Sequence, residues 1–170
     1  MKQIKFNEPK VLKALLEKTK TSTLRKAWKN CVCASYWNMN SKLENPCRIC
    51  DKKGQIEKPC KYEAGEEVEL VWTGPMNLLK TTDADIHLLS GFAILGKAKI
   101  TSIRKIFAWN GNDAPLFDGF SLREFYALND REGFNRGPNG KCTEFFNWLH
   151  KYADGFDTKK PFWLIRWDYI

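Results

Sequence analysis

The run from Phe92 to Trp109 constrains the fold of this 170-residue chain more than any other stretch. It is rich in Ile, Phe and Ala, and polar residues alternate with them at Lys97, Lys99 and Thr101. A period of two indicates a β-strand whose two faces differ in burial. We therefore expect one long bent strand or two successive strands, and long bent strands are typical of small barrels.

The remaining pattern predicts an α+β fold, a small mixed β-barrel flanked by helices. Asn7 and Pro9 indicate a helix start, and Ser121 with Glu124 forms a capping box. The final strand is apolar on both faces, which favours a central position in the sheet. The predicted elements are a helix ending near Lys18, strands over 21–28 and 66–72, the long strand, helices beginning at Ser121 and Thr143, and a strand over 161–169.

Length and composition favour one domain over residues 1–170. Hydrophobic residues make up 43% of the chain and charged residues 28%, which are globular values. No apolar run is long enough to span a bilayer, and the N-terminal residues lack the apolar region of a secretory signal. We therefore expect a cytoplasmic protein without a membrane partner.

Positive charge is concentrated in the first third of the chain. Residues 1–62 contain fifteen Lys and Arg against five Asp and Glu, although the whole chain carries only +8. A one-sided excess of this kind suits a surface that meets phosphates in RNA or DNA. A lysine-rich surface kept for solubility is the alternative.

Residues 31–60 form a Cys-rich insertion with few apolar residues to build a core. A Cys-x-x-Cys pair followed shortly by Gly54 is typical of a zinc knuckle, and closely spaced cysteines inside cells favour metal over disulfides. A redox pair and simple thiols are the alternatives. The predicted structural zinc ligands are Cys47, Cys50 and Cys60, with Cys33 or Cys31 as the fourth.

The stretch from Lys18 to Arg25 is the densest in reactive groups, with two ammonium groups, four hydroxyls and a guanidinium. It lies where the first helix leads into a strand. Alternation places Thr21, Thr23 and Arg25 on one side of that strand, facing a cleft. Thr and Ser are also ordinary on a solvated strand, which is the alternative interpretation.

Two segments together resemble the ASCH domain family. The segment Leu15–Arg25 resembles its first signature, a Leu-rich helix end followed by Gly-x-Lys-x-x-Thr-x-Arg, with Lys18 in place of the glycine. Asp118-Gly119-Phe120-Ser121, with Glu124 and Phe125, looks like its second signature. The resemblance covers most of the chain outside residues 31–60.

The resemblance implies a PUA-like barrel with RNA or a nucleotide or nucleoside as its ligand. Some family members hydrolyse N-acetylated cytidine or RNA, and a Lys, a Thr and a Glu carry the amidohydrolase reaction. Matching the signatures places these catalytic roles at Lys20, Thr23 and Asp118. We expect the ligand to be held by Lys18, Thr21, Arg25 and Trp28.

The protonation state of Lys20 decides between two roles. Nearby cations and exclusion of water would lower its pKa and let it act as a base toward Thr23, whereas an ionised Asp118 would keep it charged as a clamp. Core packing is the alternative for Trp28. A non-catalytic RNA reader that uses the basic first third and the zinc loop is the second functional hypothesis.

Overall fold

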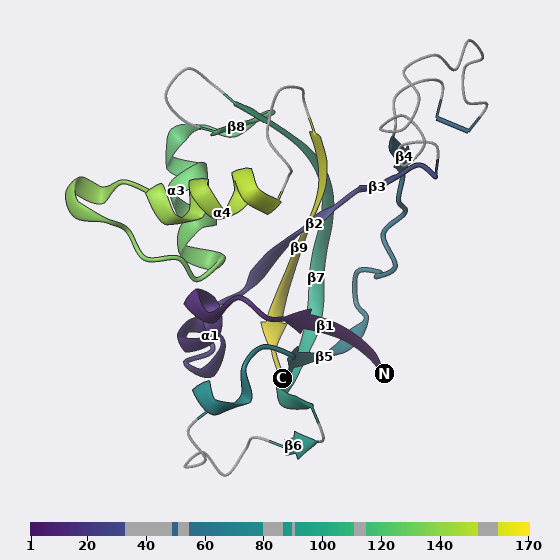
Figure 1. Cartoon of the computed structure of the whole chain (residues 1–170), viewed down its shortest axis with the longest axis vertical. Coiled ribbons are helices and arrows are strands. Elements are labelled where there is room, and N and C mark those ends of the chain that lie inside the picture. The colour runs from purple at the N-terminus through teal and green to yellow at the C-terminus, as the bar shows by residue number, and fades with distance from the viewer. Residues whose placement is uncertain (33–48, 51–54, 80–86, 90, 111–114, 153–159) are drawn as a thin grey trace.

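The long strand β7 is the centre of the sheet, pairing with β5 at one end and with β9 along most of its length (Figure 1). The computed structural model describes residues 1–32, 49–50, 55–79, 87–89, 91–110, 115–152 and 160–170. In these residues a five-strand path, β1-β5-β7-β9-β2, curls into half a barrel. The short strands β6 and β8 pair with β7 beside this path. The fold is therefore mixed α+β, as the sequence predicts.

Each element has the following bounds. The strands of the large sheet are β1 (Lys2–Phe6), β2 (Ser22–Lys26), β5 (Glu67–Trp72), β6 (His87–Leu89), β7 (Phe92–Asn110), β8 (Pro115–Phe117) and β9 (Lys160–Tyr169). A separate two-stranded sheet contains β3 (Trp28–Asn30) and β4 (Gln55–Glu57). The described helices are α1 (Pro9–Leu16), α3 (Leu122–Arg131) and α4 (Thr143–Tyr152), with 3-10 turns η1 (Met76–Leu78) and η2 (Pro138–Gly140). None of these helices is long and apolar enough to cross a membrane.

Strand β7 curves where its register with a neighbour shifts. One shift lies between Leu70 and Val71 of β5, and the other lies between Ile100 and Ser102 of β7, opposite β9. A β-bulge inserts a residue on one strand, which bends that strand and increases its twist. The prediction of a long bent strand is therefore confirmed, and the observed curl is that of a half-barrel.

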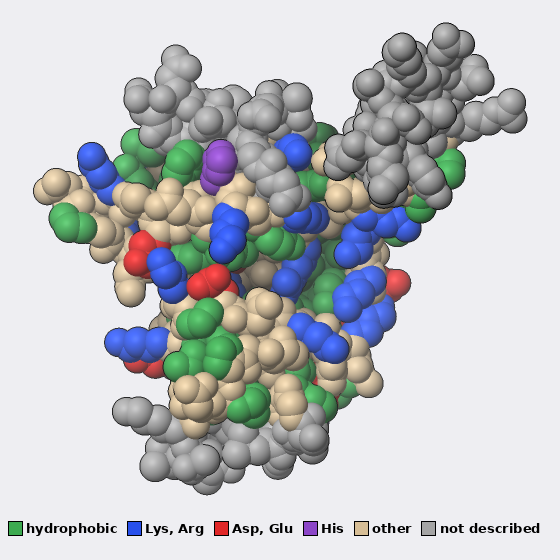
Figure 2. All heavy atoms as spheres, viewed as in Figure 1, with side chains coloured by type: hydrophobic (Ala, Val, Ile, Leu, Met, Phe, Trp, Pro, Cys, Tyr) green, Lys and Arg blue, Asp and Glu red, His purple; other side chains and the backbone are tan. Residues whose placement is uncertain are grey.

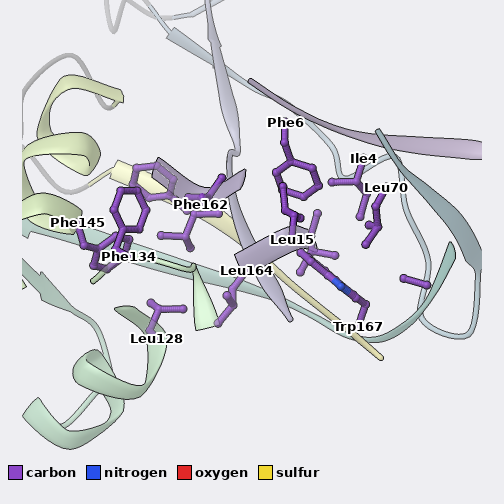
Figure 3. Close-up of a cluster of buried hydrophobic side chains, with 14 of the residues drawn as sticks. Ile4, Phe6, Leu15, Leu70, Leu128, Phe134, Phe145, Phe162, Leu164 and Trp167 are labelled. Carbon is purple, nitrogen blue, oxygen red and sulfur yellow. The ribbon is translucent and has the colours of Figure 1, made fainter. Parts of the chain in front are cut away.

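The core fills the space between the curled sheet and its helices. Phe6 and Trp167 lie with ring centroids 6.1 Å apart, and Leu15 of α1 lies near them (Figure 3). Phe134 and Phe145, 5.3 Å apart, occupy the other end of the same cluster beside α4 (Figure 3). Aromatic side chains bury large areas, so this shared cluster holds α1 and α4 against the sheet.

Strands β1 and β2 are the two ends of the strand path, and we call the strip between them the seam. The Arg25 guanidinium of β2 crosses the seam and donates a hydrogen bond of 2.6 Å to the carbonyl oxygen of Lys5 in β1. The same guanidinium lies 5.4 Å from the centroid of the Phe6 ring. A side chain therefore bridges the opening of the half-barrel.

Helix α1 ends in a tight left-handed turn at Lys18. Lys18 has φ +56°, and its N–H donates to the carbonyl oxygen of Leu15, while the N–H of Thr19 donates to that of Ala14. These two hydrogen bonds define a Schellman motif, in which glycine usually occupies the left-handed position. Lys18 thus adopts the conformation for which the ASCH signature has glycine.

Helix α3 ends in a second Schellman motif, at Gly133. Gly133 has φ +81°. Its N–H donates to the carbonyl oxygen of Asp130, and the N–H of Phe134 donates to the carbonyl oxygen of Asn129. A Cβ at Gly133 would lie 2.7 Å from the Cβ of Ala14 on α1. The ends of α1 and α3 can therefore approach this closely only with glycine at this position.

Several boundaries differ from the sequence prediction. The predicted strand over 21–28 divides into β2 and β3, and β3 leaves the large sheet to pair with β4. The N-cap of α1 is Glu8 rather than Asn7, and it makes no side-chain capping bond. The capping box of Ser121 and Glu124 is confirmed. The short strands β1, β4, β6 and β8 are not among the strands predicted from the sequence.

Replacing Gly133 with alanine should lower the free energy of unfolding by about 3 kcal/mol, because the left-handed turn and the contact with Ala14 both become unfavourable. Gly65→Ala is the matched control, since Gly65 has φ +87° but open space around its Cα. It should cost about 1 kcal/mol or less. Urea unfolding measures both changes, and equal losses would show that the contact with Ala14 does not matter.

Candidate functional site

A buried ion pair joins the approach to β2 with the end of α3. The Lys20 ammonium donates 2.8 Å to Oε2 of Glu132 and 2.6 Å to the backbone carbonyl oxygen of the same residue. The Ser22 hydroxyl donates 3.0 Å to Oε1 of Glu132. Both charged side chains are 2% exposed. Lys20 thus neutralises a buried carboxylate and also satisfies a carbonyl oxygen beside the end of α3.

Burial lowers the pKa of Lys20, because an ammonium group loses its hydration in the interior. The Glu132 carboxylate opposes this effect through its charge and its hydrogen bond, and the Arg25 guanidinium adds to the lowering. Burial and the charge of Arg25 therefore act on Lys20 as proposed from the sequence, but Lys18 does not contribute, and the opposing carboxylate is Glu132 rather than Asp118.

An inner pocket of about 80 Å³ opens beside this ion pair. Strand β2 contributes Thr23, which is 4% exposed, and Arg25. Phe6 of β1 and Tyr152 of α4 form part of the wall. The pocket therefore places a hydroxyl, a guanidinium and the Lys20–Glu132 pair around one small space at the seam.

A larger outer pocket of about 320 Å³ adjoins the inner one, since Lys5, Arg25 and Tyr152 line both. We call the two pockets together the groove. Among the described residues, five cationic side chains and no carboxylate line the outer pocket. Figure 2 shows Lys and Arg side chains gathered on the side of the molecule where β1 and the chain after β4 lie. The cationic residues of the outer pocket are Lys5, Arg25, Lys26, Lys58 and Lys61, and its aromatic residues are Trp28, Tyr62, Tyr152 and Trp163.

Lysines lie against the aromatic rings of the outer pocket. The Lys26 ammonium is 5.1 Å from the centroid of Tyr152 and 5.5 Å from that of Trp28. The Lys61 ammonium is 4.9 Å from the centroid of Tyr62. Alternating cations and aromatic faces can meet both the phosphates and the bases of a nucleic acid.

Some residues proposed from the sequence lie in the groove and others do not. Lys20, Thr23, Arg25 and Trp28 line it, although Trp28 is 5% exposed and also packs edge-on against a core phenylalanine. The remaining three proposed residues, Lys18, Thr21 and Asp118, are not among the residues that line either pocket.

The structure adds groove residues that sequence reasoning did not identify. Glu132 lies at the end of a helix before Gly133, and that position gives no sign of its burial. Lys5 could have been found, because Ile4 and Phe6 alternate with polar residues and indicate a strand. Tyr152 packs against the core from α4, and its hydroxyl accepts from the N–H of Lys26 at 3.4 Å.

The predicted zinc ligands lie partly outside the described residues. Cys33 and Cys47 are not described. Cys50 is buried, and Cys60 is half-buried and lines the outer pocket. Within the described part of the chain, no three Cys, His, Asp or Glu side chains form a group that could hold a metal. The zinc assignment therefore stays a prediction.

Comparison of the chain with protein-family models, with curated proteins and with solved structures finds no match.

Replacing Lys20 with methionine should lower the free energy of unfolding by about 3 to 5 kcal/mol, because the Glu132 carboxylate would stay buried without its counter-charge. Combining Lys20→Met with Glu132→Gln should cost less than the sum of the two single changes. Lys13→Met is the control, since Lys13 pairs with Glu17 at 3.7 Å on the exposed face of α1. Urea unfolding gives all four values, and additivity of the two single changes would contradict a coupled pair.

Proposed function

We propose that this protein binds RNA or a modified nucleoside in the groove. The observation that carries the proposal is the outer pocket, which combines five cationic side chains with four aromatic ones and has no carboxylate in the described part of its lining. Its volume falls within the range of small-molecule sites. The cations suit phosphates and the aromatic faces suit bases. The resemblance to ASCH domains supports the same class of ligand.

Hydrolysis at the inner end of the groove is a narrower proposal. Thr23 would supply the nucleophilic hydroxyl there, and Arg25 would hold a carbonyl or phosphate oxygen. Lys20 would need to pass a proton to Glu132 before it could act as a base, because both hydrogen bonds reported for its ammonium go to that residue. Its position suits a fixed positive charge better, so binding has more support than turnover.

A non-catalytic reader is the second candidate, and one observation favours it. The outer pocket takes two cations, Lys58 and Lys61, from the chain that follows β4, at the end of the Cys-rich insertion. The insertion and the groove would then recognise one ligand together. Zinc, if bound by residues 33–60, would have a structural role.

Neutralising groove lysines should weaken RNA binding in a salt-dependent way. With Lys26→Gln or Lys61→Gln, the slope of log K against log salt for a single-stranded RNA should fall by about 0.7 to 1 per substitution. Fluorescence anisotropy at several salt concentrations measures the slope. Lys141→Gln, an exposed lysine outside the groove, is the control and should leave the slope unchanged.

An unchanged slope in both groove variants, with normal unfolding, would refute binding in the groove. The same mixtures, and parallel ones with N-acylated cytidine, can be separated by chromatography to detect hydrolysis. Product that forms with the wild-type protein but not with Thr23→Val would extend the proposal to catalysis. Lys20 is unsuitable for this purpose, since its replacement also affects stability.

Zinc binding has a separate test. Elemental analysis of the purified protein should show about one zinc per chain, the stoichiometry of a single four-ligand site. The metal should be lost when Cys47 and Cys50 are both replaced with serine, because each supplies a thiolate ligand. A zinc-free wild-type protein with the same stability after chelation would end this proposal.

A further inference from the structure

Two arginines lie close together on the face of the sheet opposite the outer pocket. Trp163 and Ile165 of β9 line that pocket, and alternation turns Arg166 to the other face. Arg166 is paired with Ser102 of β7, and paired residues share a face. Arg104 lies two residues beyond Ser102 on β7, so it is a diagonal neighbour of Arg166 on that face.

Helix α3 brings a third guanidinium to this face. Arg131 is the last residue of α3, and its carbonyl oxygen accepts a hydrogen bond of 3.2 Å from the N–H of Thr21. The next residue, Ser22, is directly paired with Arg166. Partial burial lowers the pKa of Arg166, and the positive charges of Arg131 and Arg104 lower it further. We call these three residues the arginine cluster.

The described residues offset the charge of the arginine cluster only in part, through Glu124. None of the three arginines forms an ion pair within the described part of the chain. Glu124 contributes a negative charge nearby, but its Oε2 accepts from the backbone N–H of Ser121 at 2.7 Å and from its hydroxyl at 2.9 Å. The Nε atom of Arg166 is buried and has no hydrogen-bond partner in the described structure.

This arrangement is costly for a free protein. A buried donor without a partner loses its hydration, and like charges on neighbouring strands repel each other. Arg104 gains some compensation from the Phe120 ring, 5.6 Å away, but that contact supplies no negative charge. An anion on this face would offset both costs, since guanidinium groups bind phosphate oxygens in a fork-like geometry.

We propose that Arg104, Arg131 and Arg166 together bind a phosphoryl oxyanion on the α3 side of the sheet. Two sources have this chemistry, which are a free phosphate group and a backbone phosphate of a nucleic acid. The site is separate from the outer pocket, because Arg104 and Arg166 lie on the other face of the sheet. It therefore does not depend on the proposed function being correct.

The first experiment measures thermal unfolding in inorganic phosphate and in sodium chloride at equal ionic strength. Phosphate stabilises proteins in general, so the readout is the difference between variants. Replacing chloride with phosphate should raise the melting temperature of the wild-type protein more than that of Arg104→Gln/Arg131→Gln. The difference should be about 5 °C when the phosphate concentration is a hundred times its Kd. In chloride the double variant should melt at the same or a higher temperature, because repulsion is relieved. Arg123→Gln, on the exposed side of α3, is the control and should behave as wild type.

The second experiment compares the salt slope of binding to single-stranded RNA. A slope that falls in Arg104→Gln/Arg131→Gln but not in Arg123→Gln supports a backbone phosphate as the source. A free phosphate group is supported by two results together. Phosphate should still raise the melting temperature of Lys26→Gln more than that of Arg104→Gln/Arg131→Gln, and the RNA slope should be unchanged when the two arginines are replaced. If neither the phosphate effect nor the RNA slope differs between the double variant and the control, the proposal is wrong.

Discussion

The buried contact between Lys20 and Glu132 is the interaction on which the rest of the structure depends. It joins two chain reversals, the Schellman turns at Lys18 and Gly133, which end α1 and α3. A buried ion pair rarely adds much stability over apolar packing, but losing one partner is expensive. The contact therefore fixes where the two helix ends meet, and this position in turn sets the inner wall of the groove.

The open edge of the half-barrel explains why the groove forms where it does. Strands β1 and β2 end the strand path without pairing to each other in the described structure, so side chains rather than a ladder of backbone bonds occupy the seam. Arg25 bridges it, and the lysines nearby lie over aromatic rings. A surface of this composition stays hydrated and positively charged while offering flat apolar faces, which is a suitable combination for a nucleic-acid base with its phosphate.

Sequence reasoning identified the elements whose signal is local. The alternation around Lys97 and Lys99 predicted β7, and Ser121 with Glu124 predicted the start of α3, because a period and a capping box are complete within a few residues. The partner of Lys20 was not identified, since Glu132 lies 112 residues away and only the folded chain brings them together. Asp118 was proposed instead from the family signature. The contribution of β1 was also missed, although Ile4 and Phe6 alternate with polar residues over its five residues.

The two-stranded sheet of β3 and β4 influences which parts of this chain can change in length and composition. Trp28 pairs with Glu57, and the N–H of Lys58 donates 2.8 Å to the carbonyl oxygen of Ala27. Strands β3 and β4, which lie on either side of most of the Cys-rich insertion, therefore meet at the groove wall and pair outside the strand order of the large sheet. Changes in the length or composition of the insertion would leave the strand order of the large sheet unchanged and alter the wall of the outer pocket, so the pocket and the fold can vary separately.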